Sequence, residues 1–283
     1  MAGDAKLIKA KIQATQNTAQ ITKAMNMVSA SKLRQAQQAI EHYYGFIEKI
    51  ESIIRNLVSS GDVENPVFIP KEGNRTCYVI ITSERGLAGP FNNNIYKMLD
   101  SLYKDGDYVL PMGIRGYNYS KKRYNLLSND PIILRDYVRF ENIIDPLLLI
   151  INSFLNNKFD KVVIIYNHFV NTLTQTPMAR QIIPINLDTE DGVDLTKHQY
   201  DFDGGIENIL DKVLPIYIEN IVYGLILDSK ASEHASRMTA MKSATDNATE
   251  IIESLQLMYN RARQASITLE LTDIIGGANA NSE

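Results

Sequence analysis

Apolar or small side chains recur in alternating steps of three and four near both ends of this 283-residue chain. One series runs through positions 36, 40, 43, 47, 50, 54 and 57, and the other through 241, 245, 248, 252, 255, 259, 262, 266 and 269. This is the repeat of a coiled-coil seam. A helix with so narrow a stripe is marginal alone, so each series predicts a partner. Since well over a hundred residues separate the two series, we expect two long antiparallel helices with both chain ends together.

The ends of these helices can be estimated from capping residues. The first is predicted over about 4–58, where Asp4 can cap its start. The second is predicted over about 206–275, with a kink or fresh start at Pro215 and an end at Gly276-Gly277. Small residues that would let the two helices approach closely crowd both segments: Ser29, Ala30, Ser31, Ala36, Ala39, Ala231, Ser232, Ala235, Ala240, Ala244 and Ala248.

The middle of the chain has a different period. Short, continuously apolar segments at 78–81, 108–114 and 161–168 read as buried strands, and a hairpin is predicted over 171–184. Helical segments alternate with them, at 91–104, in a short Tyr- and Lys-rich stretch, and at 141–157. This alternation predicts an α/β sheet covered by helices.

The predicted fold class is therefore α/β, a long antiparallel coiled coil of N- and C-terminal helices with an inserted Rossmann-like α/β domain. The expected divisions are an N-terminal coiled-coil helix over 1–60, a globular domain over 75–186 and a C-terminal coiled-coil helix over 206–276.

Composition places the chain among ordinary soluble proteins, with 45% hydrophobic and 22% charged residues. We expect no membrane span, because no segment approaches the roughly 20 apolar residues required. We also expect no secretory signal, because the first residues lack an apolar core. The lone Cys77 excludes an internal disulfide and suits a reducing compartment. A cytoplasmic protein is the expectation.

The first forty residues are basic, although the whole chain carries a net charge of −4. This charge indicates either a solvated helix face or a surface for an acidic partner. DNA is a weaker candidate, because the basic residues are sparse and no groove-reading motif accompanies them. The basic residues, opposed by Asp4 alone, are Lys6, Lys9, Lys11, Lys23, Lys32 and Arg34.

No segment has the pattern of a catalytic, nucleotide or metal site. The turn at 83–91 could present backbone N–H groups to a phosphate, but it matches neither common nucleotide fingerprint, and Pro90 removes one donor. A structural turn is the favoured interpretation. The segment 188–194 fails as a calcium loop, and the four histidines lack metal-ligand spacing. These absences favour a structural or mechanical role.

Three segments together resemble the gamma subunit of F-type ATP synthases, in its bacterial form. They are Ile-Thr-Lys-Ala-Met-Asn-Met-Val-Ser-Ala-Ser-Lys-Leu-Arg at 21–34, Thr-Ser-Glu-Arg-Gly-Leu-Ala-Gly at 82–89, and two stretches at 231–248 and 255–268. They occur in the family's order and cover both predicted helices and the domain between them. The departures from the family pattern, at Glu84, Ala88 and Pro90, bear on local packing of the body domain.

The resemblance implies a non-catalytic central rotor shaft that couples proton or sodium flow through a membrane c ring to ATP synthesis. The implied partners are three alpha and three beta subunits, the epsilon subunit and the c ring. Neither a cofactor, nor nucleic acid, nor direct nucleotide binding is expected. The implied location is peripheral, on the cytoplasmic face of the bacterial cell membrane, where partner subunits hold the chain.

The resemblance also implies positions of contact. Arg263, Gln264 and Thr268 match polar positions that engage a beta-subunit loop, and Lys23 and Met25 match positions facing another, acidic beta loop. Met25 could equally pack in the seam. A weaker match to the motif that meets the c ring comprises Tyr200, Phe202 and Asp203.

Two other classes stay open on the residues alone. One is an enzyme, a nucleotide-binding α/β domain with helical arms. The other is a coiled-coil scaffold outside any motor, which would form a homodimer.

Overall fold

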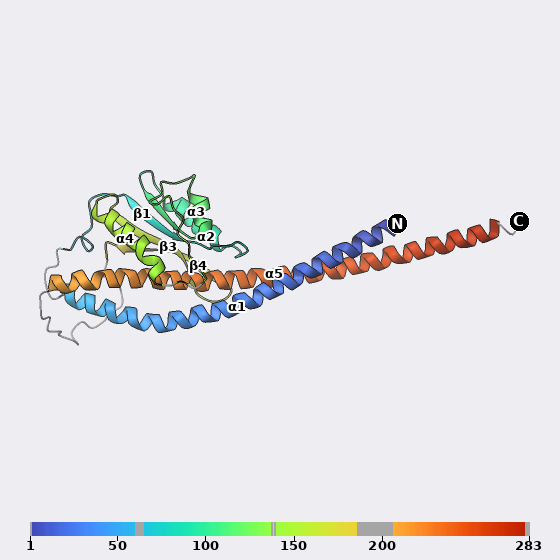
Figure 1. The fold of residues 1–283 in the computed structure, drawn as a ribbon, viewed down its shortest axis with the longest axis horizontal. Helices are drawn as coiled ribbons and strands as arrows, with labels where there is room; N and C mark the ends of the chain where they lie inside the picture. Colours follow the sequence, from blue (N-terminus) through green and yellow to red (C-terminus); the bar gives the residue numbers. More distant parts are fainter. Residues whose placement is uncertain (1, 60–64, 137, 139, 186–205, 281–283) are drawn as a thin grey trace. The chain divides into compact units, whose positions relative to one another are not determined.

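The computed structural model describes residues 2–59, 65–136, 138, 140–185 and 206–280. The chain divides into two compact units. The smaller unit comprises Met1–Ser29 with Met238–Glu283, and the larger comprises Ala30–Arg237. The two longest helices, α1 (Ala2–Ser59) and α5 (Ile206–Ala280), each contribute to both units (Figure 1).

Both long helices were expected, and their bounds differ from the prediction at one place. α1 begins and ends within two residues of the predicted positions, and α5 begins at the predicted Ile206 with Pro215 inside it. The predicted end of the second helix is wrong, because α5 passes through Gly276-Gly277 and continues to Ala280. Glycine lowers helix propensity by about 1 kcal/mol but does not block a helix, so the pair alone cannot dictate an end.

A four-stranded mixed sheet lies in the larger unit. It contains β1 (Thr76–Ile81), β2 (Tyr108–Met112), β3 (Lys161–Phe169) and β4 (Gln175–Ile183), in the order β2-β1-β3-β4. β2, β1 and β3 are parallel, and β4 pairs antiparallel with β3. The first three strands confirm the predicted apolar segments. The predicted hairpin at 171–184 is wrong in its bounds, because β4 is the only strand in that range and the first strand of the hairpin is β3.

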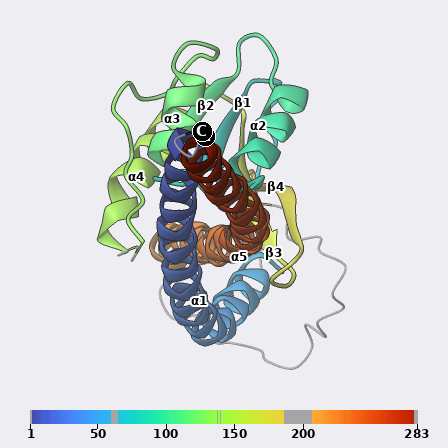
Figure 2. The same cartoon turned by 90° about the vertical axis from the view of Figure 1, so that its right-hand side faces the viewer.

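The sheet lies between two helical layers (Figures 1 and 2). α2 (Phe91–Leu102) and α3 (Ile114–Ser120) cover one face, where Ile95 and Leu99 pack against Ile80 and Ile165. The other face packs against α4 (Glu141–Leu155) and against the parts of α1 and α5 that belong to this unit. Strand residues alternate between these two clusters, as the two-residue period of a strand requires.

The larger core joins segments far apart in the sequence. Ile54 of α1, Phe154 of α4 and Ile226 of α5 are all 0% exposed and belong to one cluster. Tyr43 of α1 also donates a hydrogen bond to the Asn220 carbonyl of α5, at 2.7 Å. The first predicted apolar series therefore packs largely into the α/β unit, where 50, 54 and 57 are buried.

In the smaller unit, α1 and α5 contact each other with opposite chain directions. The hydroxyls of Thr22 and Thr245 are 2.7 Å apart, and the Asn26 amide donates to the Met238 carbonyl at 2.7 Å. Positions 241 and 248 are buried, and 245, 252, 255, 259, 262 and 266 are half-buried. Leu269, the last member of the predicted series, is 42% exposed. Because the two helices run in opposite directions and Thr22 meets Thr245, the first residue of α1 lies opposite about residue 265 of α5. α1 therefore does not extend as far as Leu269, which leaves this side chain exposed.

Candidate partner-binding surface and the buried polar belt of helix α5

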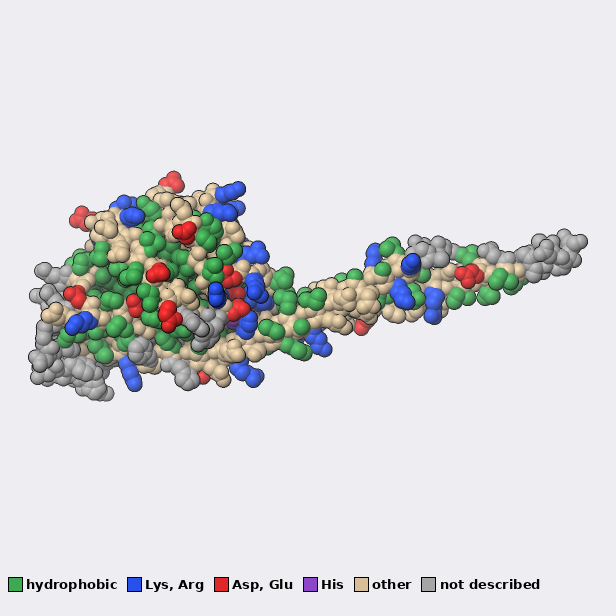
Figure 3. All heavy atoms as spheres, viewed as in Figure 1, with side chains coloured by type: hydrophobic (Ala, Val, Ile, Leu, Met, Phe, Trp, Pro, Cys, Tyr) green, Lys and Arg blue, Asp and Glu red, His purple; other side chains and the backbone are tan. Residues whose placement is uncertain are grey.

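The part of α5 in the smaller unit exposes large apolar side chains along its length. Figure 3 shows hydrophobic side chains interspersed with Lys and Arg on the visible face of this unit. Large exposed apolar groups that gather on one segment mark surfaces that contact other proteins. Eight such residues are between 42% and 67% exposed: Ile251, Leu257, Met258, Ile267, Leu269, Leu271, Ile274 and Ile275.

The predicted contact residues Arg263, Gln264 and Thr268 are all exposed on α5. The Thr268 hydroxyl donates to the Gln264 carbonyl at 2.9 Å, which fixes its side chain along the helix. Gln264, Thr268 and Leu271 are neighbours on one side of α5, since residues three and four apart share a helix face. The structure thus brings Gln264 and Thr268 together beside the exposed Leu271.

The predicted contact residues on α1 differ in exposure. Thr22 and Asn26, which lie near them on α1, bond to α5 and are buried or half-buried. Lys23 is exposed, whereas Met25 is half-buried. Lys23 is therefore available to a partner. The half-burial of Met25 fits both roles predicted for it, packing in the seam and contact with a partner.

A different environment surrounds α5 in the larger unit. Every residue from 225 to 236 is buried, although the segment is rich in polar side chains. Ala231 and Ala235, both 0% exposed, let neighbouring backbone approach the helix closely. We call the polar residues of this segment, together with the half-buried Arg237 that follows it, the polar belt: Asp228, Ser229, Lys230, Ser232, Glu233, His234, Ser236 and Arg237.

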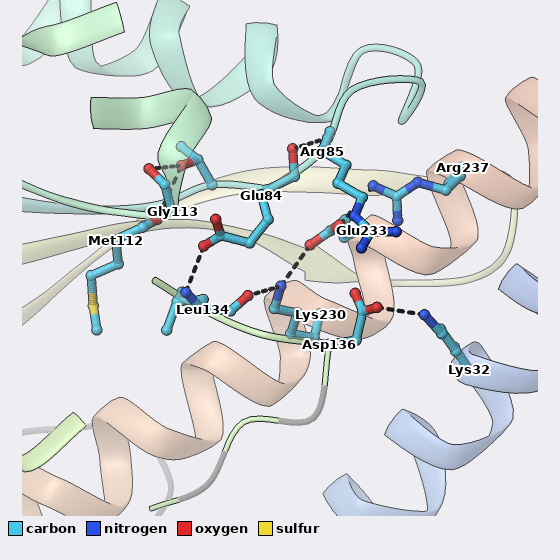
Figure 4. Close-up of polar contacts among 12 residues, drawn as sticks. Lys32, Glu84, Arg85, Met112, Gly113, Leu134, Asp136, Lys230, Glu233 and Arg237 are labelled. Atoms are coloured by element: carbon cyan, nitrogen blue, oxygen red, sulfur yellow. Dashed lines mark hydrogen bonds and ion pairs between the residues drawn. The ribbon is translucent and has the colours of Figure 1, made fainter. Parts of the chain in front are cut away.

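Three charged side chains form the centre of the belt (Figure 4). The Lys230 ammonium lies 3.0 Å from one carboxylate oxygen of Glu233, and the Arg237 guanidinium lies 2.7 Å from the other. Both Lys230 and Glu233 side chains are only 3% exposed. Burial raises the pKa of Glu233, but the charges of Lys230 and Arg237 outweigh it, so this pKa falls below its usual value. Glu233 is therefore ionised at neutral pH.

The belt also bonds to the ends of the sheet strands. The Ser232 hydroxyl donates to the Asn167 carbonyl of β3 at 2.8 Å, and the Ser236 hydroxyl donates to the Ala88 carbonyl at 2.7 Å. At the start of the belt, Asp228 accepts from the Phe169 backbone at 2.8 Å and pairs with His168 Nδ1 at 2.6 Å. Burial raises the pKa of Asp228, and these two partners only partly offset it.

His234 is the uncharged member of the belt. Its side chain is buried, and its Nδ1 atom has no hydrogen-bond partner within the part of the chain that the structure describes. Burial lowers the pKa of His234 from 6.5 to about 4; the charge of Glu233 opposes this fall, and the charges of Lys230 and Arg237 add to it. The imidazole is therefore neutral at physiological pH.

The turn after β1 is tied to α2 and α5. The Ser83 backbone N–H donates to the Asn92 side chain at 3.0 Å, and Ala88 accepts from both Ser236 and the Phe91 backbone. Leu87 adopts a positive φ of 62° within it. These contacts support a structural turn. The departures from the family pattern also act locally, because the Glu84 carboxylate accepts from the Leu134 backbone N–H.

The described residues form neither a metal-binding cluster nor a membrane-crossing helix. No group of three or more His, Cys, Asp or Glu side chains in the described ranges is placed to hold a metal ion. Among the described helices, none combines the length and the apolar character that a membrane crossing requires.

Comparison with protein families identifies the chain's relatives. A family model described as ATP synthase matches residues 4–280, which include both long helices and the sheet. The chain belongs to this ATP synthase family.

Solved structures agree with the fold of this ATP synthase family member. It is similar to a chain of the Euglena gracilis mitochondrial ATP synthase rotor, with 17% identity and a TM-score of 0.67, over 94% of this chain and all of that one. It is also similar to a chain of the Tetrahymena thermophila mitochondrial ATP synthase central stalk and c ring. There the identity is 24% and the TM-score 0.59, over 79% of this chain and 99% of that one.

The predicted c-ring contacts Tyr200, Phe202 and Asp203 lie outside the described residues. The polar belt was not predicted from the sequence as a site. Lys230 and Glu233 are three residues apart and resemble an ordinary solvated helix face. A usable signal was present, because the segment 228–237 of this ATP synthase family member contains no large apolar residue within a helix predicted to be packed.

Proposed function

We propose that this chain is the gamma subunit of a bacterial F-type ATP synthase, the central rotor shaft that couples ion flow through a membrane c ring to ATP synthesis. The family match over residues 4–280 is the observation that supports this most directly. In this proposal the chain is non-catalytic, and the catalytic sites lie on beta subunits. In this proposal, three alpha and three beta subunits surround the parts of α1 and α5 that form the smaller unit, and the epsilon subunit and the c ring contact the larger unit.

The exposed apolar residues of α5 in the smaller unit support a shaft held by partners. In water, the eight apolar residues between 251 and 275 would be an unfavourable surface, and a surrounding sleeve of protein would cover them. Many shallow contacts suit a rotating surface better than one deep anchor, because a deep anchor would favour a single angle. We infer that α1 and α5 continue as one antiparallel coiled coil inside that sleeve.

Rotation can do work only if the shaft contacts the three beta subunits differently at each angle. A ligand shifts a conformational equilibrium by its difference in affinity for the two states. A shift from 1:99 to 99:1 requires about 5.5 kcal/mol. Arg263, Gln264 and Thr268 are proposed to supply part of this difference on α5, and Lys23 and Met25 on α1. Tyr200, Phe202 and Asp203 remain the proposed contacts with the c ring.

The proposed domain organisation is the one expected from the sequence, with coiled-coil helices at 1–60 and 206–276 and a globular domain at 75–186. The proposed location is the cytoplasmic face of the bacterial cell membrane, where partner subunits hold the chain as a peripheral protein.

The first test is assembly. The tagged chain should co-purify with a ring of three alpha and three beta subunits that hydrolyses ATP. Equilibrium dialysis of the isolated chain with ATP or NAD should give no specific binding. Saturable binding of either nucleotide would support the enzyme alternative, and a homodimer that ignores alpha and beta subunits would support the scaffold alternative.

The second test addresses the contact residues. Arg263→Ala with Gln264→Ala should reduce coupled turnover of the assembled complex by about tenfold, since about 1.4 kcal/mol of angle-dependent contact would be lost. Because both side chains are exposed, the free energy of unfolding should change by less than about 0.5 kcal/mol. The matched control is Asn93→Ala with Lys97→Ala on the exposed side of α2. Unchanged turnover in the first variant would remove Arg263 and Gln264 from the proposed contact.

A further inference from the structure

The polar belt bonds α5 to a connecting segment on one side. The Lys230 ammonium donates to the Leu134 carbonyl at 3.0 Å, and this bond is buried. The same segment is held from two other elements, because Leu134 donates to Glu84 and Asp136 pairs with Lys32 of α1 (Figure 4). The segment 134–136 therefore links α5, α1 and the turn after β1.

The belt bonds α5 to the sheet on the opposite side. A helix turns about 100° per residue, so Ser232 and Ser236 point about 200° and 240° away from Lys230 around the axis. Their acceptors, the carbonyls of Asn167 and Ala88, belong to β3 and to the turn after β1. Rotation of α5 about its axis would lengthen the bonds on both sides at once.

Charged groups are an unusual way to fill this space. Apolar side chains of similar volume often give equal or greater stability than a buried ion pair, because removing charges from water is costly. Apolar packing, however, tolerates small rotations, whereas a buried ammonium or carboxylate becomes unpaired when its partner moves. Lys230, Glu233 and Arg237 all lie on α5, so their ion pairs turn with the helix, whereas the buried Lys230 ammonium would lose its Leu134 acceptor in any other rotational setting.

We propose that the polar belt sets and locks the rotation of α5 within the α/β unit, with Lys230 as the positioning residue on one side, held in place by Glu233 and Arg237, and with Ser232 and Ser236 on the other. This proposal rests on the proposed function. α5 continues from this unit into the smaller one, so a torque applied to the α/β unit reaches the rest of α5 only if the helix cannot slip. The belt prevents that slip.

The principal test replaces the charges with apolar groups of similar volume, in the variant Lys230→Met, Glu233→Leu and Arg237→Met. The assembled, membrane-reconstituted complex is measured for ions pumped per ATP hydrolysed and for the angular fluctuations of a bead on the α/β unit while the ring is stalled. We expect thermal stability equal to or above that of the native chain, at least a twofold fall in the pumping ratio and broader fluctuations. The matched control on exposed positions of α5 in the same unit is Asp211→Leu with Lys212→Met.

A milder variant keeps the test decisive if the triple variant does not assemble. Ser232→Ala with Ser236→Ala removes two bonds without leaving a buried charge, and it should broaden the angular fluctuations by a smaller factor. Native fluctuations and pumping ratio in whichever variant assembles would overturn the proposal.

Failure of the proposed function would be visible separately. If the native chain does not assemble with alpha and beta subunits, the rotor assignment fails before any variant is made. The belt can still be examined in the full isolated chain by hydrogen exchange at the Leu134 amide. We expect exchange at least tenfold faster in the triple variant than in the Asp211→Leu, Lys212→Met control, and equal rates would contradict the lock.

Discussion

One helix, α5, is built in opposite ways in its two halves. In the larger unit most residues of the polar belt are inside, with Lys230, Glu233 and His234 between 2% and 3% exposed. In the smaller unit eight large apolar residues are outside, with Leu257 and Ile274 more than 60% exposed. The first half bonds most of its buried polar groups within its own chain, with Ser229 Oγ and His234 Nδ1 as exceptions among the described residues. The second half leaves apolar surface uncovered, which is stable in water only at a cost and therefore indicates a partner.

The largest expected effect is the difference in unfolding free energy between a buried substitution in the larger unit and an exposed substitution in the smaller unit. Phe154→Ala removes a side chain that is 0% exposed and packs in the main core, so it should lower the free energy of unfolding by about 3–5 kcal/mol. Leu257→Ala, at 62% exposure, should change it by less than about 0.5 kcal/mol. Urea denaturation of the isolated chain measures both. A large loss in Leu257→Ala would mean that the outer surface of α5 is covered within the chain itself.

The next largest expected effect is the pH dependence of the unfolding free energy that comes from His234 in the buried polar half of α5. Because the pKa of His234 is about 4 in the folded chain and about 6.5 when unfolded, the unfolded state binds the proton more readily. The stabilisation is therefore complete above pH 6.5, declines as the pH falls, and is lost below about pH 4. The difference between these two pKa values corresponds to about 3 kcal/mol of unfolding free energy. Below pH 4.5, the lowered pKa values of Glu233 and Asp136 add a further loss in the same direction.

The measurement compares free energies of unfolding at pH 7 and pH 5 for the native chain and for His234→Asn. His234→Asn should lose most of the pH dependence of the unfolding free energy between pH 7 and pH 5. His168→Asn, whose ring is 40% exposed, is the control and should retain it. Equal pH dependence in the native chain and in His234→Asn would show that the imidazole is not held neutral by burial.

The two halves of α5 also differed in how well the sequence predicted them. Positions 241 to 266 follow the predicted series, because helical periodicity is local and a seam records which side faces a partner. The exposure of Leu269 was not predictable from this pattern, since a series in one helix does not show where the other helix ends. The strands at 78–81 and 161–168 were found for the same local reason.

The polar belt could not be predicted from local pattern. Lys230 contacts a carbonyl 96 residues away in the sequence, and Ser232 contacts one 65 residues away. Lys and Glu three residues apart form favourable pairs on solvated helix faces as well, so their spacing does not indicate burial. The proposed contacts Arg263 and Gln264 came from family resemblance alone, because exposed polar residues on a helix carry no local signal of function.

The smallest expected effect tests the seam of the smaller unit, where the Thr22 and Thr245 hydroxyls are 2.7 Å apart. Replacing either residue by Val leaves one part-buried hydroxyl without this partner and should cost about 1 kcal/mol of unfolding free energy. Replacing both by Val removes the polar pair together and keeps the volume, so the double variant should be nearly as stable as the native chain. The coupling energy from this double-mutant cycle should therefore be about 1 kcal/mol or more, whereas a coupling near zero would mean that the hydroxyls do not meet in solution. Thr249, whose hydroxyl bonds within α5 to the Thr245 carbonyl, supplies the control partner: the cycle of Thr22→Val with Thr249→Val should be additive.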